Sequence, residues 1–339
     1  MTRATTTLVI LTSAVVVAFL GSLATGSVTV PLGEVVTVLF GGEASTPGWA
    51  VIVVQFRLPK ALTAILAGAG LAVAGLLMQT LFRNPLAGPY VLGISSGASL
   101  MVALVVLGTT TWGLAGWIVG DLTLVMAACI GAAGVLGLVL LASRHVSTLS
   151  LLILGVLFGY ASGALVTVLL HFSIAERIRA YLQWTFGSFG SVTLGQIWLL
   201  ATVVLGALVL ATLLAKPLDG LLLGEAEARA LGVEVGRVKT GVLIATALLA
   251  GSITAFCGPI GFIGIAVPHL ARGLLGSVRH RLLIPASAAA GALIALLADL
   301  LAQLPGHDAV LPLNAVTALL GAPVIAWIVI RGRNLGELF

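Results

Sequence analysis

The stretch ALTAILAGAGLAVAGLLMQTL, residues 61–81, is long enough to cross a lipid bilayer as a single helix. It carries no charged residue, and a spanning helix needs about 20 mainly apolar residues. Its apolar residues run continuously, with Leu and Ala dominant, whereas a strand of a membrane β-barrel alternates apolar and polar residues. The stretch therefore predicts an integral membrane protein of the all-α class.

The rest of the chain repeats this pattern. Charged residues make up 8% of the 339 residues, against about 25% in a soluble domain. So little polar surface excludes a soluble enzyme, a disordered chain and a nucleic-acid-binding protein. We predict a polytopic bundle of about ten transmembrane helices in one domain, residues 1–339. The expected spans are Leu8–Leu23, Ala61–Leu81, Tyr90–Leu107, Leu114–Leu141, Leu149–Leu170, Leu194–Ala215, Gly241–Phe256, Gly261–Leu275, Leu282–Leu301 and Leu313–Ile330.

The basic residues predict the orientation of the bundle. With the N-terminus in the cytoplasm, 12 Lys and Arg residues fall on the inside and 4 on the outside, as the positive-inside rule requires. Ten spans then place both termini in the cytoplasm. Leu8–Leu23 could instead be a signal peptide, because Arg3 gives it a basic start and small residues follow it. Against this alternative, the apolar run is long for a signal peptide.

The energy source for any transport is expected to lie outside this chain. No Walker A motif is present, and none of the lysines (Lys60, Lys216 and Lys239) follows a Gly. Ion-coupled transporters usually carry carboxylates near the membrane midplane or broken helices. The ionisable residues in the predicted spans are few: Asp121, His269, Arg272 and Asp299. We expect no catalytic residue and no enzymatic activity in this chain.

A partner is indicated by the longest inner loop, residues 216–239. Its segment from Gly224 to Leu231 has the pattern of a short amphipathic helix, and Gly232 marks the end of that helix. Such a helix could lie on the lipid surface. Its residues Glu225 and Glu227 are poorly suited to anionic lipid, so a protein partner is favoured.

Several motifs resemble those of the FecCD-type permeases, the membrane subunits of ABC importers for iron chelates, haem and cobalamin. The similarity runs from about Val30 to Gly332, in the order typical of that family, and no single motif would be specific by itself. The matching segments are Arg57-Leu58-Pro59-Lys60, Gly75–Ala87, Leu92–Ala98, Gly224–Gly232, Gly258–Gly264, Val267–Arg272, His280–Ala286 and Thr317–Pro323.

The resemblance implies an assembly in the bacterial inner (plasma) membrane. Two permeases, as a homodimer or a heterodimer, would bind two cytoplasmic ATPases and an extracytoplasmic binding protein. The expected cargo is an iron chelate, a ferric siderophore, with haem or cobalamin as the alternative within the family. An ion-coupled secondary transporter or a channel is the disfavoured alternative from another class.

The resemblance also implies roles for individual residues. Arg57 and Lys60 would dock the binding protein, although both could simply extend their charges to the membrane interface. The family commonly has a second outer basic residue where this chain has Gln303, and the outer loop at 304–314 is atypical too. Asn84, Ser147 and Thr148 would form a cytoplasmic gate, although Asn84-Pro85 also fits a plain turn. The ATPase-coupling residues would be Gly224, Glu225, Ala226, Arg229, Leu231 and Gly232.

No metal site or cofactor is expected. His269 follows Pro268 and could ligate haem, but a lone His at a helix kink is more often hydrogen-bonded within the structure. Cys129 and Cys257 lie in apolar stretches without CxxC spacing, so they indicate neither a metal site nor a disulfide. The glycines of the second span, Gly68, Gly70 and Gly75 among them, fit tight helix packing, or helices that must slide past one another.

Overall fold

The computed structural model describes residues 3–108, 121–143, 145–303 and 310–331, and the regular elements among them are all helices. Seven helical stretches are long and apolar enough to cross a membrane. They are α1 (Arg3–Ala24), a continuous helix of α3 (Pro47–Val51), the π-helical turn η1 (Ile52–Arg57) and α4 (Leu58–Phe82), then α6 (Asp121–Ser143), α7 (Thr148–His171), α9 (Leu194–Leu213), α12 (Val235–Cys257) and α14 (His280–Ala302). The predicted all-helical, multi-pass fold is confirmed.

Three further predicted spans coincide with shorter apolar helices. These are α5 (Ile94–Gly108), α13 (Ile263–Leu275) and α15 (Leu313–Arg331). Because α5 and α13 have 15 and 13 residues, less than a full span, the number of ten spans stays a prediction. Residues 114–120 of the fourth predicted span and most of the loop at 304–314 lie outside the described residues.

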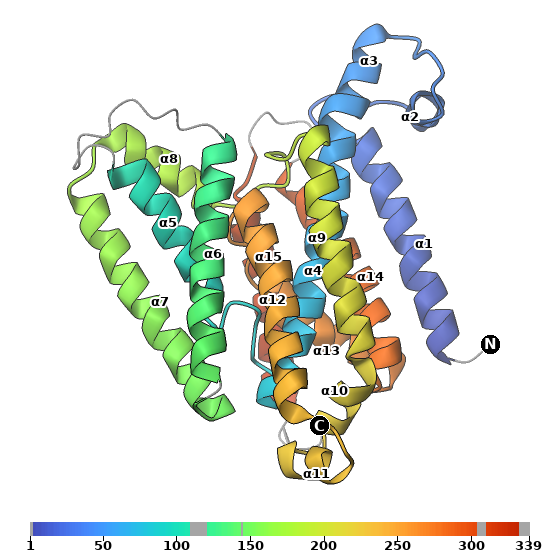
Figure 1. Cartoon of the computed structure of the whole chain (residues 1–339). Helices are drawn as coiled ribbons and strands as arrows, with labels where there is room; N and C mark the ends of the chain where they lie inside the picture. The colour runs from blue at the N-terminus through green and yellow to red at the C-terminus, as the bar shows by residue number, and fades with distance from the viewer. Residues whose placement is uncertain (1–2, 109–120, 144, 304–309, 332–339) are drawn as a thin grey trace.

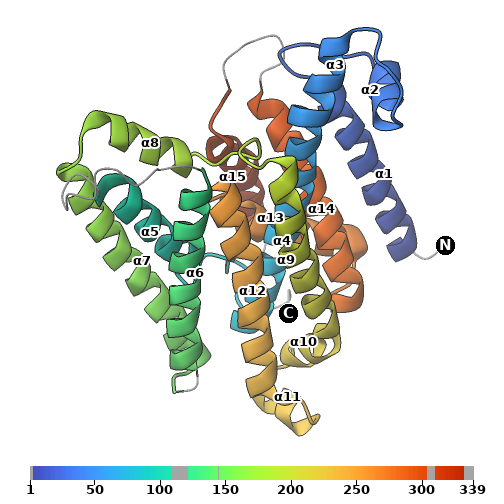
Figure 2. The same cartoon turned by 45° about the horizontal axis from the view of Figure 1, so that its top comes forward.

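The short helices divide between the two ends of the bundle (Figures 1 and 2). At one end, α10 (Ala215–Leu221) and α11 (Glu225–Ala230) lie near the start of α7, and we call this end the α11 face. At the other end lie α2 (Leu32–Leu39), α3 and α8 (Ala175–Thr185), and we call this end the α8 face. Neither α2 nor α8 was predicted, because they have 8 and 11 residues and a span needs about 20.

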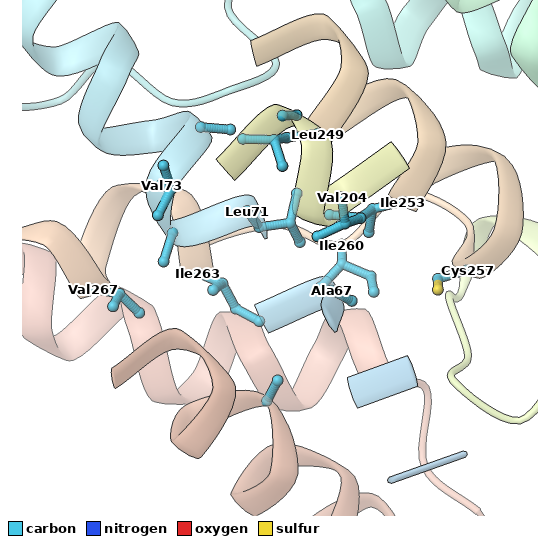
Figure 3. Packing of buried hydrophobic residues seen from close by; sticks show 14 of the residues in the cluster. Ala67, Leu71, Val73, Val204, Leu249, Ile253, Cys257, Ile260, Ile263 and Val267 are labelled. Carbon is cyan, nitrogen blue, oxygen red and sulfur yellow. The ribbon is translucent and has the colours of Figure 1, made fainter. Parts of the chain in front are cut away.

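The centre of the bundle is α4. In its most apolar stretch 83% of the residues are buried, and α12 and α14 follow with 72% and 61%. Figure 3 shows how side chains from other helices surround the middle of α4: Val204 of α9 and Leu249 and Ile253 of α12 lie near Leu71. In the packed centre, α4 therefore contacts helices α9 and α12, which lie more than 100 residues later in the chain.

Glycines bring α4 into backbone contact with its neighbours. A Cβ at Gly68 would collide with the carbonyl of Gly291 in α14, and one at Gly75 would collide with the carbonyl of Gly264 in α13. Small residues permit such close approach where water cannot drive helix association. At these positions the structure supports tight packing as the role of the glycines. By contrast, a Cβ at Gly137 of α6 would meet nothing within 4 Å.

The first helix belongs to this bundle. It packs along α14, and its residues Leu11, Ala18 and Leu23 are buried. Arg3 donates hydrogen bonds to the carbonyls of Leu274 (3.2 Å) and Gly273 (3.1 Å) at the end of α13. These bonds fix the start of α1 at the same end of the bundle as α11 (Figure 1).

Candidate functional site

On the α8 face, Arg57 closes the end of the first helix. Its Nη1 donates to the carbonyl oxygens of Leu23 at 2.8 Å and Ala24 at 3.0 Å, and its Nη2 donates to that of Val28. The last carbonyls of a helix have no partner within the helix and carry partial negative charge, so a guanidinium suits them. The structure thus gives Arg57 a packing role, and its docking role stays a prediction.

Lys60 lies one turn further along and forms a largely buried ion pair. Its Nζ is 3.0 Å from Oδ1 of Asp299 in α14, whose side chain is 6% exposed. Gln303 donates to the other carboxylate oxygen of Asp299 at 2.7 Å. Lys60, Asp299 and Gln303 therefore tie α4 to α14 near the α8 face. The sequence analysis noted Asp299 as a rare charge within a span but did not find its partner, which is 239 positions away in the chain.

At the opposite end, glycines bound the predicted coupling helix. Gly224 (φ +122°) precedes α11 and Gly232 (φ +81°) follows it, both in a backbone region that L-residues rarely adopt. A Cβ at Gly224 would also strike the carboxylate of Glu227. Ala228 is fully buried and anchors the helix to the bundle. The structure thus has the predicted short helix, one residue shorter at each end than the expected Gly224–Leu231.

The other side of α11 is open. Ala226 and Arg229 are exposed, and Leu231 is 66% exposed directly after the helix. Glu225 and Arg229 form an ion pair of 2.9 Å, one helical turn apart. This surface combines paired charges with an apolar side chain, as expected of a contact for another protein.

One of the three predicted gate residues, Thr148, contacts the predicted coupling helix. Thr148, the first residue of α7, donates from Oγ1 to Oε1 of Glu225 at 2.8 Å. Ser147 caps α7, because its Oγ accepts the backbone N–H of Ser150 at 3.1 Å. Asn84 accepts the backbone N–H of Leu86 at 2.9 Å within its own turn. The structure thus joins Thr148 to Glu225, while Asn84 lies in the tight turn that its sequence favours.

A second polar cluster on the α11 face links α10 to the packed centre. The carboxylate of Asp219 accepts both the backbone N–H of His280 (2.8 Å) and its ring Nδ1–H (2.7 Å). The other ring nitrogen lies 2.8 Å from Oγ1 of Thr80 in α4. Asp219 therefore caps α14 from a distance and connects the coupling segment with α4. This cluster was not predictable from local sequence, because Thr80 and His280 lie 200 positions apart.

His269 is a structural residue. Its ring is buried and its Nε2 donates to the carbonyl of Pro85 at 2.7 Å, which ties α13 to the turn after α4. Among the described residues, no group of three or more His, Cys, Asp or Glu side chains could hold a metal ion. Along the described chain, these polar contacts join α11 to α7, α10 to α14 and α4 to α14. Such contacts can transmit a movement of one helix to the next.

Comparison with known proteins agrees with this architecture. A family model, the FecCD transport family, matches residues 14–331. The vitamin B12 import system permease protein BtuC of Salmonella paratyphi A is 39% identical over 317 residues, covering 91% of this chain and 94% of that protein. The protein of the same name from Klebsiella pneumoniae is 42% identical over 284 residues, covering 83% of both chains.

Solved structures show the same fold. A metal-chelate type ABC transporter in an inward-facing conformation superposes with a TM-score of 0.82 and 29% identity, covering 96% of this chain and 99% of that chain. PsaBC from Streptococcus pneumoniae, in complex with Fab, superposes with a TM-score of 0.52 and 16% identity over 88% of this chain and 95% of that chain, and supports the fold alone. The chain is thus a multi-pass protein of the bacterial inner membrane and belongs to the FecCD transport family, as a permease of an ABC importer.

Proposed function

We propose that this chain imports a metal held in a large organic chelate, with cobalamin as the first candidate cargo. The support is the similarity, close to 40% identity over most of the chain, to vitamin B12 import permeases. A ferric siderophore is the second candidate, because the chain is also similar over 96% of its length to a metal-chelate type transporter. Haem is a third cargo of the same chemical kind.

The observation that carries the proposed mechanism is the hydrogen bond between Thr148 and Glu225. We propose that the segment 216–239 is the coupling element and that Asn84, Ser147 and Thr148 form the gate. An ATPase subunit that binds α11 through Ala226, Arg229 and Leu231 would displace Glu225. Since Glu225 binds the first residue of α7, this displacement would reach the gate directly.

The α11 face is the cytoplasmic face in this proposal, with ten spans and both chain termini in the cytoplasm. Basic residues at this end support the orientation, as the positive-inside rule expects. They are Arg83, Lys216, Arg229, Arg237, Arg279 and Arg281. The single domain then comprises the whole chain, residues 1–339.

Two further partners complete the assembly. A second permease would pack beside this one, and α7 is available for it, because only 22% of its most apolar stretch is buried. A binding protein would dock on the α8 face beside Arg57 and Lys60, where Arg57 supplies positive charge and the charge of Lys60 is balanced by Asp299. Because both side chains also hold the bundle together, the docking surface would be rigid.

Charge reversal tests the docking role of Arg57. Arg57→Glu should slow association with the binding protein most strongly at low salt, while assembly with the ATPase persists, because rim charges act mainly on the association rate. Arg179→Glu, an exposed change on α8, serves as the matched control. Unchanged binding of Arg57→Glu at low salt would remove this role.

Cross-linking tests the gate. Ser147→Cys should form a disulfide with its counterpart on the facing permease and block uptake, while binding-protein docking persists. A cross-link that leaves the uptake rate unchanged would show that this turn lies off the cargo path.

Reconstitution tests the function itself. The permease, the ATPase that co-purifies with it and the cognate binding protein would be placed in proteoliposomes, and ATP-dependent uptake of cobalamin, ferric siderophore and haem would be compared. Uptake of cobalamin alone is the expected result. Uptake of the ferric siderophore instead would establish the second candidate, and uptake driven by an ion gradient without ATPase would contradict the proposal.

A further inference from the structure

A pocket opens on the α11 face beside the coupling segment. Its volume is about 490 Å³, and it lies between the end of α4, the α10–α11 connection and the turn that precedes α14. The residues that line it are Arg83, Asp219, Leu222, Leu223, Val278 and Arg279. Asp219, Leu222 and Leu223 belong to the proposed coupling segment, whereas Arg83, Val278 and Arg279 lie outside it.

The pocket carries more positive than negative charge, because two guanidiniums and one carboxylate line it. Within the described parts of the chain, the guanidinium groups of Arg83 and Arg279 form neither an ion pair nor a hydrogen bond. Nearby basic residues differ, since Arg229 pairs with Glu225 and Arg237 pairs with Glu234 at 2.7 Å. Asp219 also lines the pocket, but its Oδ1 already accepts two bonds from His280. Two guanidiniums therefore remain available for an anion.

The backbone conformation of Arg83 directs its guanidinium toward the start of α11. Arg83 follows α4 with φ +45°, a left-handed conformation that glycine adopts more readily than residues with a side chain. A Cβ at Gly224 would lie 3.5 Å from Nη1 of Arg83, so this guanidinium sits directly beside the start of α11. The pocket is thus continuous with the coupling segment.

The walls of the pocket are apolar and accessible. Leu223 is 60% exposed and Val278 is 45% exposed. An occupant that satisfies both the walls and the charges needs a carboxylate next to an apolar side chain. Guanidinium groups bind carboxylates through two parallel hydrogen bonds, which gives such a contact its geometry.

We propose that this pocket receives an acidic side chain, flanked by an apolar residue, from the ATPase subunit. It would form a second contact beside α11, and the inference rests on the proposed function. Continuity with the proposed coupling segment identifies the occupant as the ATPase, and the two guanidiniums identify its contacting group as a carboxylate. The second contact would hold the ends of α4 and α14 while α11 moves, so that force on α11 acts on α7.

Charge reversal in the intact permease–ATPase complex tests the proposal. We would measure the Kd of the co-purifying ATPase for wild-type permease, Arg83→Glu, Arg279→Glu and the double variant at rising ionic strength. Each single change should weaken binding about tenfold at low salt, and the difference should shrink as salt screens the charges. Arg83→Lys and Arg279→Lys should keep most of the affinity. Arg281→Glu, exposed nearby but not in the pocket, is the matched control.

Two outcomes would overturn the proposal. The first is wild-type affinity in the double variant, with monodisperse elution and an unchanged melting temperature. The second is unchanged ATPase affinity together with lost retention of phosphatidylglycerol by the detergent-purified permease, which would make the occupant a lipid. If a Glu variant fails to fold, Arg83→Gln and Arg279→Gln give the same comparison. Loss of ATPase binding in α11 variants, together with wild-type affinity in the pocket variants, would refute the pocket and leave the proposed function intact.

Discussion

The helices α4 and α7 are equally apolar but differ in their surroundings. The most apolar stretch of each has a mean hydropathy of 2.1, yet 83% of that stretch is buried in α4 and 22% in α7. Glycines on α4 contact the backbones of α13 and α14, whereas α7 presents large side chains outward, including Tyr160, which is 76% exposed. Hydropathy thus identifies both helices as spans, but it does not tell the buried central helix from the one at the edge.

The two helices also differ in how their ends are held. Polar clusters tie α4 at both ends, through Lys60 and Asp299 at one and through Thr80 and His280 at the other. The start of α7 is bonded to α11, the helix of the proposed coupling element. This contrast fits the proposal of a fixed centre and a gate at the start of α7, and the changes below are designed to break it or to sharpen it.

The largest effect is expected from crowding α4. Gly75→Val would drive a side chain into the backbone of Gly264, which cannot move aside as a flexible side chain can. We expect a destabilisation of about 3 kcal/mol, near the upper end for overpacked cores, and loss of monodisperse protein in detergent. Gly137→Val on α6 is the control, because its new side chain meets open space. Equal yields of the two variants would contradict the account of α4.

A similar but smaller loss should follow from breaking the ion pair near the α8 face. Lys60→Met leaves the Asp299 carboxylate buried with Gln303 as its remaining partner, and should cost about 3 kcal/mol or slightly less. Thermal melting of the purified protein measures this loss. Adding Asp299→Leu to Lys60→Met should restore most of the stability, since no buried charge remains. Failure of this rescue would show that the pair does not act as a unit.

A moderate effect is expected at the other end of α4. Asp219→Ala removes the acceptor for two N–H groups of the buried His280, and should lower the stability by about 2 kcal/mol. Glu234→Ala is the control, because it breaks an exposed pair with Arg237 and should cost less than about 0.5 kcal/mol. Equal melting temperatures for the two variants would show that the bonds from His280 to Asp219 do not stabilise the packing of α10 on α14.

The smallest effect should come from the helix cap of α7. Ser147→Ala removes the oxygen that accepts the N–H of Ser150, and loss of such a cap costs about 1 kcal/mol. Ser147→Asp keeps an acceptor and should retain the stability of the wild type. Hydrogen exchange over the first turn of α7 would detect the difference locally. Equal exchange in both variants would show that the cap does not hold this turn.

Much of the fold was predictable from single segments of sequence. Apolar runs of about 20 residues, the length of a helix that spans a membrane, predicted the position of most spans. Gly224 and Gly232 predicted where α11 begins and ends. Each of these features is local, so neighbouring residues suffice to find it. The amphipathic helix α8 is local too, but it is too short and too polar to be found by a search for spans.

The contacts within the site were not predictable in the same way. Thr148 and Glu225 were each predicted to matter, yet nothing in the sequence places them 2.8 Å apart. The partners of Lys60 and His280 likewise depend on how α4, α10 and α14 pack. A charged residue in an apolar span indicates that a partner exists. Which residue serves as that partner is decided by the tertiary fold.

The most direct test of the central claim is the number of cargo molecules imported per ATP hydrolysed by Thr148→Val in proteoliposomes. Val keeps the shape of Thr but cannot donate to Glu225, so α11 would move without drawing α7 with it. The account predicts that the ATPase still binds and hydrolyses ATP, while uptake per ATP falls several-fold. An unchanged ratio of uptake to hydrolysis would contradict transmission through this hydrogen bond.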